Sequence, residues 1–128
     1  MTPPDQSAEP RFDITLRRAY EPPEQDGCTR ILVERLWPRG VSKQKAAIDH
    51  WVRDAAPSTE LRKWYDHIPG RWPEFQRRYI AELEANEDAV RQLMAVCDEG
   101  PCCFVFAARD VERNSAVVLK AYLDGLSD

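Results

Sequence analysis

Two polar segments each follow an apolar run that is typical of a buried β-strand. Residues 37–40 (WPRG) follow "ILVERL", and residues 109–110 (RD) follow "CCFVFAA". In parallel α/β sheets, ligands bind beyond the carboxyl ends of the strands, where the following helices present free N–H groups. If the two strands are neighbours, Arg39, Arg109 and a helix that begins at Asn114 converge there. We expect a cleft for a small anion, such as a nucleotide or a phosphorylated metabolite, at this place.

The same arginines also have a purely structural interpretation. They could form ion pairs with Glu34, Asp54 and Asp110 and touch no ligand. Ion-pair networks and binding sites look alike in a sequence, so both interpretations stay open. Arg35 lies inside the apolar run, where an arginine needs a partner.

Asp110 is the best candidate for a catalytic residue, because it follows a strand and precedes a capped helix. Arginines nearby should lower the pKa of its carboxyl group and make it a poor general acid. The position equally suits an anion that favours the helix dipole. The sequence contains no Ser/His/Asp order, no glycine-rich phosphate loop and no metal-ligand cluster. It therefore predicts no metal site, names no cofactor and leaves open whether the protein is an enzyme.

A nucleic-acid-binding or regulatory module is the alternative function. The segment 30–45 is basic, and Trp37 and Trp51 could stack on bases. Tryptophan more often closes a hydrophobic core, and that interpretation is favoured for both rings.

Composition limits the class of protein. The chain has 128 residues, of which 43% are hydrophobic and 31% are charged, and its formal net charge is −4. These values suit one globular domain with no general attraction to nucleic acid or membranes. The sequence shows no secretory signal and no apolar run of membrane-spanning length. Four cysteines without a CxxC pair suit a reducing compartment, so we expect a cytoplasmic protein.

The elements that must position these side chains follow from periodicity, caps and breakers. The pattern predicts strand, strand, helices, strand, helix: a small single-domain α/β sandwich with a mostly parallel central sheet flanked by helices. Residues 1–11 are expected to be a disordered tail, and 12–128 the domain. Strands are predicted within 12–20, 30–37 and 102–108, with a short extended piece ending near residue 57. Helices are predicted over 42–48, 58–65, 73–85 and 86–97, and from 114 onward.

Four motifs carry a resemblance: "RILVERLWPRGVSK", "WVRDAAPSTELRKWY", "RWPEFQRRY" and "FVFAARDVERNSAVVL". On them the chain resembles the YeaO-like branch of a bacterial family, the domain of unknown function 488. The resemblance implies a compact cytosolic α/β domain without an established activity. It supports as motif positions Arg35, Trp37, Arg39, Asp54, Ser58, Arg109, Asp110 and Asn114.

The loop after the last strand departs from the broader family, which tends to carry a Cys-His-Arg element there. This chain has Asn114, Ser115 and Ala116 instead, and Ser115 replaces the histidine that the YeaO-like branch often keeps. The resemblance therefore carries no nucleophile or base from that loop over to this chain.

Overall fold

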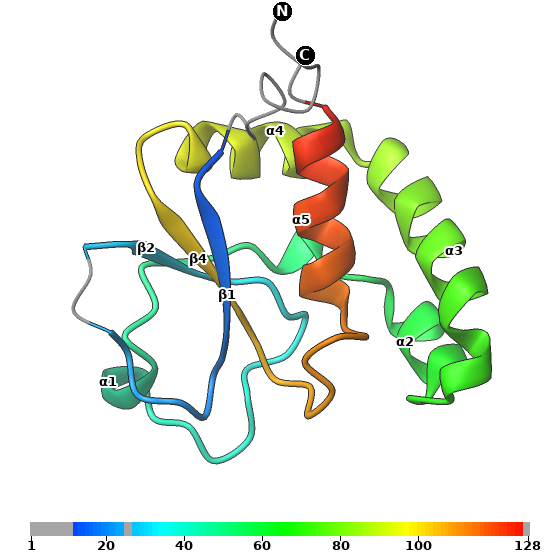
Figure 1. The fold of residues 1–128 in the computed structure, drawn as a ribbon, viewed down its shortest axis with the longest axis horizontal. Coiled ribbons are helices and arrows are strands. Elements are labelled where there is room, and N and C mark those ends of the chain that lie inside the picture. The colour runs from blue at the N-terminus through cyan, green and yellow to red at the C-terminus, as the bar shows by residue number, and fades with distance from the viewer. Residues whose placement is uncertain (1–11, 25–26, 127–128) are drawn as a thin grey trace, which may run out of the picture.

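The computed structural model describes residues 12–24 and 27–126, and the expected disordered tail, 1–11, lies outside them. Figure 1 shows a small α/β domain with a four-stranded parallel sheet in the order β1-β4-β2-β3. The strands are β1 Ile14–Arg18, β2 Thr29–Leu32, β3 His50–Trp51 and β4 Cys102–Phe106. The helices are α1 Lys43–Ala46, α2 Thr59–Tyr65, α3 Trp72–Glu84, α4 Glu87–Cys97 and α5 Ser115–Gly125, with 3-10 turns η2 Arg53–Ala55 and η3 Pro69–Arg71. The expected fold class is confirmed.

Strand β4 is the centre of the sheet, because its five residues are all apolar and all buried. It pairs with β1 on one side, where Ile14 is opposite Cys102, and with β2 on the other, where Ile31 is opposite Phe104. A strand that alternated polar and apolar residues would expose one face to water. The continuous apolar run is therefore what allows β4 to be covered on both faces.

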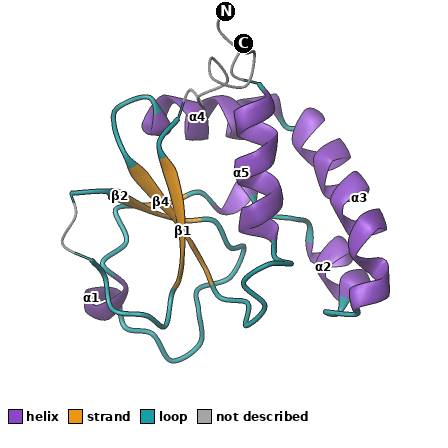
Figure 2. Cartoon of the chain, viewed as in Figure 1, coloured by secondary structure: helices purple, strands orange, loops and turns teal. Residues whose placement is uncertain are grey.

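The two faces of the sheet are covered differently. Helices α2 to α5 pack on one face, where Tyr79 and Leu119 join Ile31 and Phe104 in the main core. The other face has a smaller cluster around Leu32 and Val105, against which Trp37, Ile48 and Trp51 pack. Figure 2 shows this asymmetry, with α1 set apart from the group of the other helices. No helix in the described part of the chain is long and apolar enough to cross a membrane.

Side-chain caps begin three of the helices, as the sequence predicts. Ser42, Ser58 and Asn114 accept hydrogen bonds from the N–H groups of Lys45, Leu61 and Val117, each at 3.1 Å. Each bond satisfies a backbone donor that the first turn would leave without a partner. Asn86 precedes α4, but its amide donates to the carbonyl of Asp54 instead of capping the helix.

Four predicted elements are shorter than expected, and local contacts explain three of them. Strand β2 ends at Leu32, not residue 37, because the chain leaves the sheet after the N–H of Val33 bonds to β4. Strand β4 ends at Phe106 because the next N–H, of Ala107, donates to a side chain. Helix α1 ends at Ala46 because Ala47 adopts a left-handed conformation, with φ +50°. Strand β1, predicted within 12–20, spans Ile14–Arg18.

Candidate functional site

A cavity of about 490 Å³ opens at the carboxyl ends of β2 and β4. This volume lies within the range of small-molecule sites. The place is the one that the strand-end rule predicts for a parallel sheet. The lining residues are Glu34, Leu36, Pro57, Thr59, Arg62, Lys63, Tyr65, Asp66, His67, Phe75, Ala107, Ala108, Arg113, Asn114 and Ser115.

Glu34 connects the ends of two strands at the side of the cavity formed by the sheet. Its Oε2 accepts a hydrogen bond of 2.9 Å from the N–H of Ala107, so its carboxylate joins the outgoing ends of β2 and β4. The indole Nε1 of Trp51 donates to the backbone carbonyl of Glu34 at 2.7 Å. Burial raises the pKa of the Glu34 carboxyl above its usual value, partly opposed by the Ala107 N–H and the charges of Arg62 and His67.

Basic side chains supply most of the charge around the cavity. Arg62 and Lys63 come from the last turn of α2, and neither forms an ion pair within 12–24 and 27–126. Arg113 comes from the loop before α5 and pairs with Asp110, with Nε and Oδ2 2.9 Å apart. The cavity therefore has two uncommitted cations beside the N-terminus of a helix.

The corner after α2 is conformationally strained. Asp66 and His67 are consecutive residues with positive φ, +48° and +54°. Both line the cavity. Residues other than glycine adopt this backbone conformation at a cost of about 1–2 kcal/mol each. Such strain is often found at functional sites. The strained corner turns His67 towards the ring of Tyr65, whose centroid is 5.7 Å away.

Residues 54–58, the wall strip, run beside the cavity without a strand partner, and side chains satisfy their backbone groups. Tyr79 donates its hydroxyl to the carbonyl of Ala55. Arg35 donates to the next two carbonyls, from Nη2 to Ala56 and from Nε to Pro57, both at 3.0 Å. Buried backbone groups need such partners, so these side chains fix the position of the wall.

The wall strip also explains two other motif positions. Ser58 caps α2 and binds the Glu82 carboxylate through its N–H at 2.8 Å and its hydroxyl at 2.6 Å. The Asp54 carbonyl accepts the amide of Asn86 at 2.8 Å, and the residue is exposed. Arg35, Asp54 and Ser58 therefore lie in or against the wall strip, outside the lining of the cavity.

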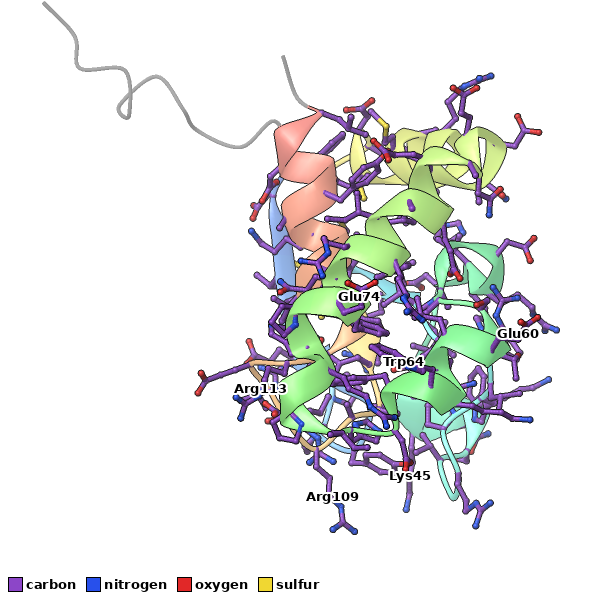
Figure 3. All side chains as sticks on the ribbon, turned by 90° about the vertical axis from the view of Figure 1, so that its right-hand side faces the viewer. Lys45, Glu60, Trp64, Glu74, Arg109 and Arg113 are labelled. Atoms are coloured by element: carbon purple, nitrogen blue, oxygen red, sulfur yellow. The ribbon has the colours of Figure 1, made fainter. Side chains whose placement is uncertain are left out.

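The other five predicted site residues are dispersed. Asn114 lines the cavity, is 4% exposed, and donates its amide to the carbonyl of Asp110 at 2.9 Å. Arg39 and Arg109 are exposed and lie outside the lining, and Figure 3 shows the Arg109 side chain extending away from the protein. The strands are neighbours, but only Asn114 of the three expected residues reaches the cavity. Neither Arg39 nor Arg109 forms an ion pair within the described residues.

Trp37 belongs to the opposite face of the sheet, where it packs against Trp51 with ring centroids 5.5 Å apart in an edge-on arrangement. The indole of Trp37 donates to the carbonyl of Val41 at 2.6 Å. The guanidinium of Arg53 lies 3.9 Å from the ring centre of Trp51. Both rings close the smaller core, as the favoured interpretation predicted. Arg30, from the basic segment, is also buried, and its Nε donates to the Ala46 carbonyl.

Asp110 organises the loop before α5. Its Oδ1 accepts hydrogen bonds from the N–H groups of Glu112 and Arg113, at 2.9 and 3.0 Å. The Arg113 guanidinium, followed by those two N–H groups, lowers the pKa of Asp110. The direction is the expected one, but the arginine responsible is Arg113.

We expect Asp110→Asn to reduce stability modestly, because the amide oxygen keeps the two backbone bonds and only the charge pair is lost. A lowered carboxyl pKa stabilises the fold above the unfolded value, about 3.9, and this contribution disappears as the pH falls through the folded value. Urea unfolding of wild type and variant should therefore differ more at pH 7 than at a pH well below about 3.9. An equal difference at both pH values would contradict this role. A turnover that the variant loses by more than about a hundredfold would make Asp110 catalytic instead.

Sequence reasoning missed most of the residues that line the cavity. Glu34 carried a signal, since an acid within an apolar run marks a strand end or a site. Arg62 and Lys63 sit on an ordinary charged helix, and only the packing of α2 beside the strand ends reveals their place. His67 is exposed and borders the cavity, and it belongs to no catalytic motif of the sequence.

The parallel sheet with helices packed against it defines a small α/β protein, with a cavity at the carboxyl ends of β2 and β4. Comparison with known families is more specific: residues 13–127 match the model described as "Inactive DUF488-N3 subclade". The chain belongs to the DUF488 family, in the branch that contains YeaO, as the four motifs indicated.

The similar proteins are bacterial. "Uncharacterized protein YeaO" of Escherichia coli strain K12 is 37% identical over 115 residues, which are 90% of this chain and 100% of the relative. "Uncharacterized protein Rv3073c" of Mycobacterium tuberculosis strain H37Rv is 38% identical over 112 residues, 88% and 94% of the two chains. "Uncharacterized protein Mb3100c" of Mycobacterium bovis gives the same values. Among solved structures, none matches the chain.

Proposed function

We propose that this protein binds a small anion, such as a nucleotide or a phosphorylated metabolite, in the cavity at the ends of β2 and β4. One observation carries the proposal: Arg62 and Lys63 face a cavity of ligand size without an ion pair among the described residues. The word "inactive" in the description of the subclade supports binding without turnover.

Three features would act together on a phosphate. A guanidinium such as that of Arg62 donates two parallel hydrogen bonds to phosphate oxygens, and Lys63 adds a compact charge. The N-terminus of α5, at Ser115, adds the positive end of a helix dipole. Apolar walls from Leu36, Pro57 and Phe75 suit the uncharged body of such a ligand.

A thermal-shift screen tests this proposal with sulfate, inorganic phosphate and nucleoside monophosphates at millimolar concentrations. A ligand at a hundred times its dissociation constant stabilises the folded state by about 2.7 kcal/mol, which is easily measured. Replacing Arg62 and Lys63 together with alanine should weaken the affinity by at least about tenfold, because charge-assisted bonds are lost.

Arg39→Ala is the matched control, since Arg39 is a basic residue of the expected site that the structure leaves outside the cavity. It should leave the shift unchanged. If no anion stabilises the wild type, or if Arg39→Ala removes the shift while the double variant keeps it, the proposal is wrong.

We also propose that this binding takes place in the cytoplasm. Cys97 and Cys102 form no disulfide, although their sulfurs lie only 3.4 Å apart. Such a pair supports a reducing compartment.

A further inference from the structure

Glu34 presents an incompletely used carboxylate to the cavity. One oxygen, Oε2, accepts the N–H of Ala107, whereas Oε1 accepts no hydrogen bond from the residues that the structure describes. Glu34 also forms no ion pair among those residues. Trp51 holds the backbone carbonyl of Glu34, and the Ala107 N–H holds its carboxylate, so both ends of the residue are anchored. The cavity therefore contains a rigid acceptor with spare capacity.

The charged form of this carboxylate is energetically unfavourable at its buried position. Burial disfavours its charged form, and Arg62 and His67 act on it only through space. A partly desolvated anion without a contacting cation gains strongly when a donor arrives. A charged N–H donor forms a bond roughly twice as strong as a neutral one. The chemistry of Glu34 thus selects for nitrogen that carries a positive charge.

The rest of the lining includes positively charged side chains. Arg62 and Lys63 supply positive charge to the lining, Arg113 is already paired with Asp110, and Asp66 adds a second carboxylate, with Leu36 and Phe75 among the apolar walls. We propose that Glu34 determines specificity in this cleft by binding a protonated amine, so that the preferred ligand is zwitterionic, with an anionic group held by the basic side chains. This inference rests on the proposed anion site for one half of the ligand and on Glu34 for the other.

The contributions of the anionic group and the protonated amine can be separated by measuring the affinities of three small phosphates by isothermal titration calorimetry. O-Phosphoethanolamine ends in an ammonium group, 2-hydroxyethyl phosphate ends in a hydroxyl, and ethyl phosphate ends in a methyl. The wild type should bind phosphoethanolamine about tenfold or more tighter than ethyl phosphate, and also tighter than the hydroxyl compound. A hydroxyl compound that binds as tightly as the amine would overturn the selection for charged nitrogen.

Glu34→Gln is the decisive variant, because its amide oxygen can still accept the N–H of Ala107 and so preserve the strand ends. It should reduce the ratio of the affinities for phosphoethanolamine and ethyl phosphate to about one. Arg62→Ala should weaken the binding of both phosphates and keep the ratio of their affinities. Arg39→Ala should change neither the affinities nor their ratio. A ratio near one in the wild type, or a ratio that Glu34→Gln leaves intact, would falsify the role of Glu34.

Ethanolamine, which carries the ammonium alone, distinguishes failure of this inference from failure of the proposed function. If no phosphate binds but ethanolamine binds and Glu34→Gln weakens it, the anion site is wrong and Glu34 keeps its role. If ethyl phosphate binds with no preference for the amine, the anion site stands and the inference about Glu34 is wrong. If none of the probes binds, both are wrong.

Discussion

Replacing Arg35 with alanine is expected to lower the free energy of unfolding by about 2–4 kcal/mol. Its guanidinium donates to the carbonyls of Ala56 and Pro57, each at 3.0 Å. Hydrogen bonds from a charged group contribute roughly 1.5–3 kcal/mol each, and the partial exposure of Arg35 lowers their combined contribution. The two carbonyls would lose their side-chain donor. Urea unfolding followed by circular dichroism measures the change, provided that the slope of the transition stays constant.

Arg35→Lys is the informative companion variant, because a lysine retains the charge but cannot reach two carbonyls with a planar fork. It should recover only part of the lost stability. Arg39→Ala should cost less than about 0.5 kcal/mol, as surface substitutions usually do. If Arg35→Ala leaves stability intact and abolishes anion binding, Arg35 is a ligand contact, as its place in the motif suggested, and its structural role is wrong.

Tyr79→Ala is expected to destabilise the fold by about 3–5 kcal/mol, the usual cost of removing a large aromatic side chain from a core. Tyr79 is 0% exposed and packs against Phe75, with ring centroids 5.9 Å apart. Tyr79→Phe keeps the ring and removes only the hydroxyl that donates to Ala55, at an expected cost of about 1–3 kcal/mol. Chemical unfolding of the two variants separates packing from the hydrogen bond.

Arg35 and Tyr79 hold adjacent carbonyls of the wall strip, so their effects should not add. The double variant Arg35→Ala/Tyr79→Phe should differ from the sum of the single changes by about 0.5–3 kcal/mol. Strict additivity would show that the two side chains stabilise the wall strip independently, which contradicts a shared segment.

Local features of the fold could be predicted from the sequence, because local chemistry determines them. Ser42, Ser58 and Asn114 cap helices through contacts within three residues, and the uninterrupted apolar run of β4 indicated a doubly covered strand. The same run predicted a mostly parallel sheet, and the three strand pairs of the sheet are all parallel.

The lining of the cavity could not be predicted, because it depends on contacts between distant residues. Glu34 meets the N–H of Ala107, 73 positions away in the chain, and no periodicity reports such a contact. Arg35 was rightly identified as a residue in need of a partner, but a sequence does not show which way a side chain points. Its partners are backbone carbonyls, which no sequence motif distinguishes.

Asp110 shows the same limit at short range. The lowered pKa was predictable from a nearby arginine, yet Arg113 provides it, three residues later, because the loop before α5 folds back on the carboxylate. The sequence offered Arg39 and Arg109 as partners of Asp110, but Arg113 is the partner, and the Arg109 side chain extends away from the protein (Figure 3).

The position of β4 between β1 and β2 also constrains how the chain folds during synthesis. Thr15 in β1 and the Cys102 carbonyl in β4 meet although 87 positions separate them. Strands β1 and β2 leave the ribosome long before the strand that joins them, and contacts of such long range form slowly. Until β4 emerges, the first two strands present unpaired edges to other chains, so this is the stage at which a chaperone would most increase the yield of folded protein.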